Sequence, residues 1–190
     1  MKNLKLNFAL LFFIVLIHFI QVGLTQTSYN LPNGWFKAGS HRENYLMGVD
    51  STIFYGEAPG SSGSVKSISN FNGFGTLMQN FFPKEYLDKR VRLSAFVKSN
   101  NVTGWAGMWM RADTVSNQYL DNMLNVLDIS EFATNLAFGI LLSGEGEVWL
   151  DECKFEIVDP KIVNLTDVVV FDEGVEANPN ALQYPINLSF

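Results

Sequence analysis

The stretch that decides the fold is residues 139–159, which reads GILLSGEGEVWLDECKFEIVD. It holds two apolar runs around the turn-prone residues 143–147, and the second run alternates between two sides. One side carries Trp149, Asp151, Cys153, Phe155 and Ile157, and the other carries Val148, Leu150, Glu152, Lys154 and Glu156. Alternation with a period of two beside a glycine-rich turn predicts a β-hairpin that is buried on one face. We therefore expect the upstream segments to be further strands that this hairpin closes into a sandwich.

The upstream sequence contains more segments that are typical of strands. Residues 91–98 alternate cleanly, with Val91, Leu93, Ala95 and Val97 predicted to face inward. Residues 105–113 (WAGMWMRAD) are apolar on both faces, which favours a central strand covered on each side. Residues 76–82 and 136–142 predict two more strands, and residues 83–89 a single helical turn that begins near Pro83. Regularly spaced strands with turn signals between them predict an all-β fold, an antiparallel β-sandwich of the jelly-roll type.

The first residues of the chain have the pattern of a secretory signal peptide. Lys2 and Lys5 precede an apolar run over residues 8–20, and small and polar residues follow over 23–28. A membrane anchor is the alternative, but a bilayer-spanning helix needs about 20 apolar residues and this run is shorter. We expect residues 1–25 to be removed and the protein to be secreted, without a membrane partner after cleavage.

Charge and cysteine content narrow the classes of partner. The formal net charge is −6, and losing residues 1–25 removes two lysines and no acids, which makes it −8. No basic cluster remains, so nucleic acid is not an expected partner. Three sequons, at Asn101, Asn164 and Asn187, fit a secreted glycoprotein. Cys153 is the only cysteine, so no internal disulfide can form, and its place on an alternating face favours a buried apolar role over catalysis.

A set of short motifs carries a resemblance to a known fold family. In order they are GWFKAGS (34–40), VRLSAFVK (91–98), GWAGMWMR (104–111), DNM (121–123), FGILLSG (138–144) and VWLDECKFE (148–156). Together they resemble galactose-binding-like jelly rolls similar to carbohydrate-binding modules, including accessory β-sandwich domains of bacterial proteins and of some AraC-type regulators. The resemblance covers about residues 29–159, which we take as the binding domain. Residues 160–190 form an acidic tail, whose last four residues resemble the start of a second, truncated repeat.

The sequence departs from that family in two places. Relatives usually have an additional aromatic strand between the DNM motif and FGILL, so residues 122–135 look shortened and one sheet edge is in doubt. Relatives also often bind calcium through an early Glu and the Asp that corresponds to Asp151. The early Glu is absent from residues 29–35, so we expect no cofactor and only a weak metal candidate at Asp151. We expect Asp151 instead to accept hydrogen bonds from the N-terminal segment around residues 30–35.

The sequence lacks the common catalytic motifs, and we expect a protein that is not an enzyme. There is no GxSxG or HExxH motif, and His41 is the only histidine outside the leader. The acidic residues at 145–152 suit a solvated sheet edge better than the facing carboxylates of a glycosidase. Arg111 needs a partner or a ligand within an apolar strand, and Asp113 or Asp121 is the internal alternative to a ligand. The predicted ligand-binding residues are Gln79, Phe96, Trp109, Arg111 and Asn122.

Aromatic rings beside planar polar groups are typical of saccharide sites, although buried tryptophans more often belong to a core. The leading hypothesis is therefore a secreted, non-catalytic module for a saccharide-like polar ligand. The alternative is a structural or interaction domain that binds no small ligand.

Overall fold

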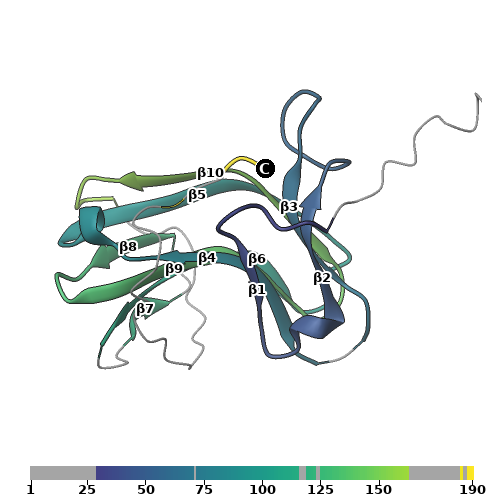
Figure 1. Ribbon diagram of the computed structural model, residues 1–190, viewed down its shortest axis with the longest axis horizontal. Helices are drawn as coiled ribbons and strands as arrows, with labels where there is room; N and C mark the ends of the chain where they lie inside the picture. Colours follow the sequence, from purple (N-terminus) through teal and green to yellow (C-terminus); the bar gives the residue numbers. More distant parts are fainter. Residues whose placement is uncertain (1–28, 71, 116–118, 123–124, 163–184, 186–187) are drawn as a thin grey trace, which may run out of the picture.

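The computed structural model describes residues 29–70, 72–115, 119–122, 125–162, 185 and 188–190 (Figure 1). They form ten strands: β1 (Phe36–Ala38), β2 (Tyr45–Asp50), β3 (Ser62–Ser67), β4 (Phe74–Phe81), β5 (Lys89–Asn100), β6 (Trp105–Thr114), β7 (Tyr119–Asn122), β8 (Val126–Ile129), β9 (Ala133–Ser143) and β10 (Glu147–Ile157). Two short 3-10 helices complete the set, η1 (Arg42–Asn44) and η2 (Lys84–Tyr86), the second within the predicted helical turn. No helix among the described residues has the length and apolar character needed to cross a membrane.

The strands form two antiparallel sheets that pack face to face. Sheet A has the order β1-β4-β9-β6-β7, and sheet B has the order β2-β3-β10-β5-β8. Figure 1 shows β5 and β10 in one layer and β4, β9 and β7 in the other. If β1 and β2 are set aside as added edge strands, β3 to β10 form two four-stranded sheets between which the chain repeatedly crosses. This is the order of a jelly roll. The predicted all-β sandwich is therefore confirmed, and the first and last of these eight strands, β3 and β10, are paired.

The core lies between the sheets and is built from the inward side of each strand. Strand β9 contributes four side chains that are completely buried, Leu136, Phe138, Ile140 and Leu142. Sheet B contributes Val91, Leu93, Val148 and Leu150 to the same core. The sequence predicts that the first two of these face inward. Burying one such side chain stabilises the fold by roughly 1.5–3 kcal/mol. The side chains between the two sheets therefore make a large contribution to the free energy of folding.

The predicted hairpin at residues 139–159 is wrong in its pairing, although both strands exist. Strand β9 pairs with β4 and β6 in sheet A, whereas β10 pairs with β3 and β5 in sheet B. The turn at residues 144–146 therefore carries the chain from one sheet to the other. Period-two alternation shows that a segment is a strand, but it does not say which partner the strand takes.

The alternation of β10 is also interrupted, by a bulge between Asp151 and Lys154. Glu152 has φ of 49°, the left-handed region, and adds one residue to the strand. Before the bulge, Val148 and Leu150 face the core; after it, Cys153 joins the same core. The predicted side that grouped Trp149 with Cys153 is therefore split between the two faces of sheet B.

Both sheets are complete at the edge that the sequence leaves in doubt. Strand β7 pairs with β6 at the edge of sheet A, and β8 pairs with β5 at the edge of sheet B. The segment that looks shortened in the sequence thus contains the short edge strand β8 and leads from β7, so both edges are paired. The short β8 places Val126, Leu127 and Ile129 in buried positions, so four residues suffice to close that end of the core.

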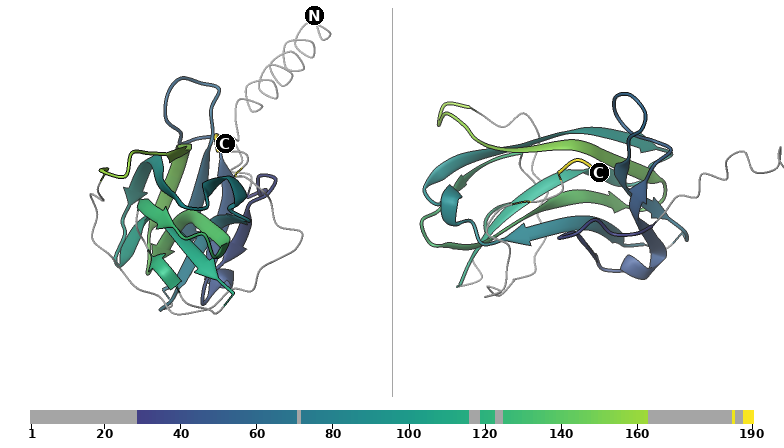
Figure 2. Two further views of the ribbon diagram at one scale, coloured as in Figure 1. Left: turned by 90° about the vertical axis from the view of Figure 1, so that its left-hand side faces the viewer. Right: turned by 45° about the horizontal axis from the view of Figure 1, so that its top comes forward.

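The last three residues pack on this same sandwich (Figures 1 and 2). The backbone N–H of Cys153 donates to the carbonyl oxygen of Leu188 at 2.9 Å. The centroids of the Phe190 and Trp35 rings lie 5.1 Å apart. The edge of the Phe190 ring occupies the space that a side chain at Gly63 would need. Residues 1–25, most of the predicted acidic tail, and the sequon residues Asn164 and Asn187 lie outside the described residues.

Candidate functional site

The structure places the five predicted site residues in three parts of the sandwich: the core, the outer face of sheet B and the outer face of sheet A. Gln79 pairs with Phe138, so its side chain faces the core, where it is completely buried. Phe96 lies on the outer face of sheet B, and Trp109 and Arg111 lie on the outer face of sheet A. Asn122 pairs with Arg111 through the backbone of β7. Only Trp109, Arg111 and the backbone of Asn122 come together, and Gln79 and Phe96 are separated from them because strand register assigns each to another face.

Trp109 is held in place on sheet A by packing neighbours and by a hydrogen bond. Its Nε1 donates to Thr76 Oγ1 at 2.9 Å, and Thr76 Oγ1 donates to the carbonyl oxygen of Ile140 at 2.9 Å. Met78, Ala137 and Leu141 pack beside it in a small apolar cluster outside the main core. The indole is 7% exposed. Its position is therefore fixed, and its polar edge is already used inside the protein.

Arg111 has the internal partner that the sequence allows. Its Nε lies 2.7 Å from Asp113 Oδ1, and its second nitrogen donates to Asp113 Oδ2 at 3.2 Å. Asn135 Nδ2 donates to the same Oδ2 at 2.8 Å. The Asp113 side chain is 3% exposed and that of Arg111 14%. Since Asp113 is nearly removed from water, the Arg111 cation is needed to offset the cost of burying its charge.

Trp105 is a candidate that the sequence analysis did not select. It shares the outer face of sheet A with Trp109 and Arg111. A Cβ placed on Gly107 would meet the Trp105 ring at 2.7 Å, so the indole lies over the glycine. Trp105 is nevertheless 36% exposed. The signal is the spacing: a glycine two residues after a tryptophan on a strand leaves room for the ring to lie flat on the sheet.

These residues form one continuous strip along β6. Every second residue of β6 faces outward, and at roughly 3.3 Å per residue the strip is about 26 Å long. Its residues are Trp105, Gly107, Trp109, Arg111 and Asp113. The strip begins with a partly exposed indole and ends with a guanidinium–carboxylate–amide group. Such a strip offers an apolar surface and fixed hydrogen-bonding groups, which is the composition of many small-molecule sites. Among the described residues, no three His, Cys, Asp or Glu side chains converge to hold a metal ion.

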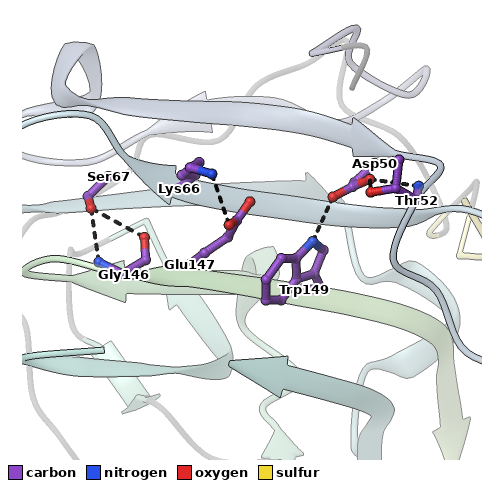
Figure 3. A network of polar contacts seen from close by, with 7 residues as sticks. All are labelled: Asp50, Thr52, Lys66, Ser67, Gly146, Glu147 and Trp149. Carbon is purple, nitrogen blue, oxygen red and sulfur yellow. Dashed lines mark hydrogen bonds and ion pairs between the residues drawn. The ribbon is translucent and has the colours of Figure 1, made fainter. Parts of the chain in front are cut away.

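Sheet B has its own polar network on its outer face (Figure 3). Trp149 Nε1 donates to Asp50 Oδ2 at 2.8 Å, while the backbone N–H and the hydroxyl of Thr52 donate to Asp50 Oδ1. Burial acts to raise the pKa of Asp50, but these hydrogen bonds outweigh it and lower that pKa below its ordinary value. Lys66 pairs with Glu147 at 3.1 Å on the same face.

The expected role of Asp151 needs a correction. Its carboxylate accepts the backbone N–H of Tyr55 at 2.9 Å and that of Glu152 at 2.8 Å. It therefore holds the loop of residues 51–61 rather than the N-terminal segment. Asp151 lies with Trp149 on the outer face, next to that loop, because the strand alternates regularly as far as the bulge. Asn101, the one sequon residue that the structure describes, is exposed in the turn after β5, so glycosylation there stays a prediction.

Comparison with known proteins gives one sequence relative and structural neighbours. The chain is 36% identical over 176 residues to an uncharacterized HTH-type transcriptional regulator of Bacillus subtilis (strain 168), YbfP. The match covers 83% of this chain and 56% of the regulator, so the chain spans little more than half of that relative. No protein-family profile matches the chain.

Among solved structures, the enzymatically active domain of tailspike protein 4 of bacteriophage CBA120 matches with a TM-score of 0.52 and 10% identity. It covers 70% of this chain and 20% of the tailspike chain. A carbohydrate-binding module of the β-sandwich superfamily matches with a TM-score of 0.43 and 13% identity, over 70% of this chain and 62% of the module. At such low identity the tailspike likeness concerns the fold alone, and it agrees with the β-sandwich described above.

Proposed function

We propose that this β-sandwich is a secreted, non-catalytic module that binds a saccharide-like polar ligand along the outer face of sheet A. The observation that carries the proposal is the Trp105 indole, which occupies the space above Gly107 and is 36% exposed. Tryptophan has a large apolar face, and a ring that already rests against the strand loses little freedom when a ligand covers it. The C–H face of a pyranose is a ligand surface that matches such a ring.

The other end of the strip would supply the polar contacts of the site. The Arg111 guanidinium is 14% exposed and is held in one geometry by the nearly buried Asp113, which also accepts a hydrogen bond from Asn135. Sugar hydroxyls accept hydrogen bonds, and a donor that is fixed in place selects among them. Arg111 is thus proposed to line the polar end, with Asp113 holding it in place and Asn122 beside it on β7.

The Bacillus relative bears on where this module sits in larger proteins. A helix-turn-helix motif consists of two α-helices, and the described residues of this chain contain only two three-residue 3-10 helices. The aligned part covers 83% of the chain and must include most of the sandwich. We therefore infer that the shared part is the β-sandwich and not the DNA-binding motif.

The proposal is tested by affinity electrophoresis and calorimetry against galactan, galactomannan, xylan and β-glucan. We expect retardation by at least one polysaccharide, and a loss of affinity on the order of tenfold or more for Trp105→Ala. Gly107→Ala is the sharper variant, because the added Cβ displaces the ring without removing it. Phe132→Ala, which removes a 69% exposed ring outside the strip, is the control and should bind as the wild type does.

Two results would contradict the proposal. Binding that Trp105→Ala and Gly107→Ala leave unchanged would remove the outer face of sheet A as the site. Absence of binding to every polysaccharide, together with self-association that Trp105→Ala abolishes, would favour the alternative of an interaction domain.

A further inference from the structure

A pair of exposed rings lies on the opposite side of the molecule from Trp105, on the outer face of sheet B. Tyr55, from the loop of residues 51–61, stacks on Phe96 of β5 with ring centroids 3.3 Å apart and an interplanar angle of 10°. Tyr55 is 55% exposed and Phe96 47%. Leaving two large rings in water forgoes the stabilisation that burial would give them, so their placement together on the surface calls for an explanation.

The loop that carries Tyr55 projects beyond the sandwich (Figures 1 and 2) but is fastened at several points. Asp151 accepts the Tyr55 N–H at 2.9 Å, and Ser62 Oγ donates to the carbonyl oxygen of Ile53 at 2.5 Å. The ring of Phe54 covers Gly60, which closes the loop on itself. The stacked pair is therefore held in place before any ligand arrives, which lowers the entropic cost of binding.

Lys98 and Trp149 border the stack. Lys98 is two residues from Phe96 on the same face of β5 and pairs in register with Trp149. Its ammonium lies 5.6 Å from the centroid of the Trp149 ring, and no ion pair to Lys98 is found among the described side chains. The Trp149 ring is itself fixed by Asp50 (Figure 3). The flexible Lys98 side chain thus places a hydrogen-bond donor beside the fixed ring of Trp149.

The charges around the stack favour a neutral ligand over an ion. The carboxylates of Asp50 and Asp151 offset the ammonium of Lys98, and Lys66 is paired with Glu147. Both aspartates already accept hydrogen bonds from the protein, so neither is open to a cation at low cost. An anionic ligand would meet at least as much negative as positive charge here.

We propose that Tyr55, Phe96 and Lys98 form a second binding site, which takes a neutral saccharide. The apolar face of a pyranose would lie on the exposed rings, and the Lys98 ammonium would donate to a hydroxyl or ring oxygen. The site shares only its ligand class with the proposal for sheet A, because its residues belong to the other sheet and face the opposite way.

The test uses the full chain with each face disabled in turn. Tyr55→Ala/Phe96→Ala removes the stack, Tyr55→Leu keeps apolar bulk without a ring, and Trp105→Ala disables sheet A. Each variant is checked by circular dichroism and thermal unfolding, then measured by calorimetry against galactan, galactomannan, xylan and β-glucan. Phe132→Ala is again the exposed-ring control. We expect the wild type to bind with two sites, and each disabled face to leave one.

The possible results separate the two proposals. Loss of one site in the Tyr55→Ala/Phe96→Ala protein, also seen in Tyr55→Leu, supports the second site even if Trp105→Ala has no effect. Unchanged stoichiometry and affinity in a folded Tyr55→Ala/Phe96→Ala protein would overturn it, whatever Trp105→Ala does. Failure of the wild type to bind any of the four polysaccharides would overturn the assignment of the stack to a neutral saccharide.

Discussion

The ion pair between Arg111 and Asp113 links the stability of sheet A to the site that we propose on its outer face. Both groups lie on the outer face of sheet A, yet Asp113 is almost inaccessible to water. A carboxylate in that position depends on its cation, so removing the cation should cost more than removing the pair. This asymmetry gives a direct measure of what the pair contributes.

We predict that Arg111→Ala destabilises the protein by roughly 3 kcal/mol, because Asp113 is left buried with Asn135 as its one remaining side-chain partner among the described residues. The double variant Arg111→Met/Asp113→Asn should cost less, since it leaves no unpaired charge and its amide can still bond Asn135. Urea unfolding of the wild type, Arg111→Met, Asp113→Asn and the double variant gives the coupling free energy. Equal stability of Arg111→Ala and wild type would show that the pair contributes nothing.

Cys153 provides a prediction about alkaline pH. Burial, with smaller contributions from Asp151 and Glu152, raises the pKa of its thiol from 9.0 to about 12. Above pH 9 the unfolded thiol loses its proton while the folded one keeps it, so the stability of the fold falls as pH rises from about 9 toward 12. At pH 10 this loss is on the order of 1 kcal/mol relative to pH 8.

Cys153→Ala should therefore lose less stability between pH 8 and pH 10 than the wild type. Chemical unfolding at both values measures the two differences. Tyrosine ionisation, which affects both proteins alike, cancels in the comparison. Parallel losses in the two proteins would mean that the thiol does not report burial in this way.

At the scale of elements, the loop of residues 51–61 depends on a carboxylate from another strand. Asp151→Ala leaves the backbone N–H groups of Tyr55 and Glu152 without their acceptor, which should cost roughly 1–3 kcal/mol. The loop should also become a protease-sensitive segment, detected by limited proteolysis and mass spectrometry. The melting temperature of the wild type should be the same with calcium and with a chelator. A shift of many degrees would instead identify a structural metal at Asp151.

The bulge in β10 gives the opposite kind of prediction, a variant that stabilises. Glu152 adopts φ of 49°, a conformation that costs a side-chain-bearing residue about 1 kcal/mol and costs glycine little. Its side chain is exposed. Glu152→Gly should therefore raise the free energy of unfolding by up to roughly 1 kcal/mol, measured by urea unfolding. Glu156→Gly, an exposed position on the same strand without positive φ, is the matched control and should destabilise.

The individual strands could be predicted from the sequence better than their pairing. The strand at residues 91–98 was predictable because its side chains alternate, and the strand at residues 105–113 because it is apolar on both faces. The pairing of residues 139–159 was not predictable, since a turn between sheets and a hairpin turn use the same glycines. Nor was the place of Gln79 and Phe96, because the face of each residue depends on register with a strand distant in sequence.

At the scale of the whole molecule, the sandwich is held closed near β10 by the last residues. Phe190 contacts Trp35 and lies over Gly63, which joins three distant parts of the chain. Phe190→Ala should lower the free energy of unfolding by roughly 1–3 kcal/mol, as expected for a partly buried ring. Phe132→Ala, which removes a more exposed ring, should cost less than 0.5 kcal/mol. Thermal and chemical unfolding compare them, and equal effects would show that Phe190 does not anchor the end of the chain.

The hydrogen bond from Cys153 to Leu188 has a consequence for how local opening can be watched. The only sulfhydryl of the chain belongs to the residue whose backbone N–H makes this bond, and it is buried in the core. A thiol reagent added to the native protein therefore reacts with it only when this part of the fold opens, and each opening is recorded as a covalent modification. The rate of this modification therefore measures local opening around Cys153, as amide hydrogen exchange does, but at a single side chain.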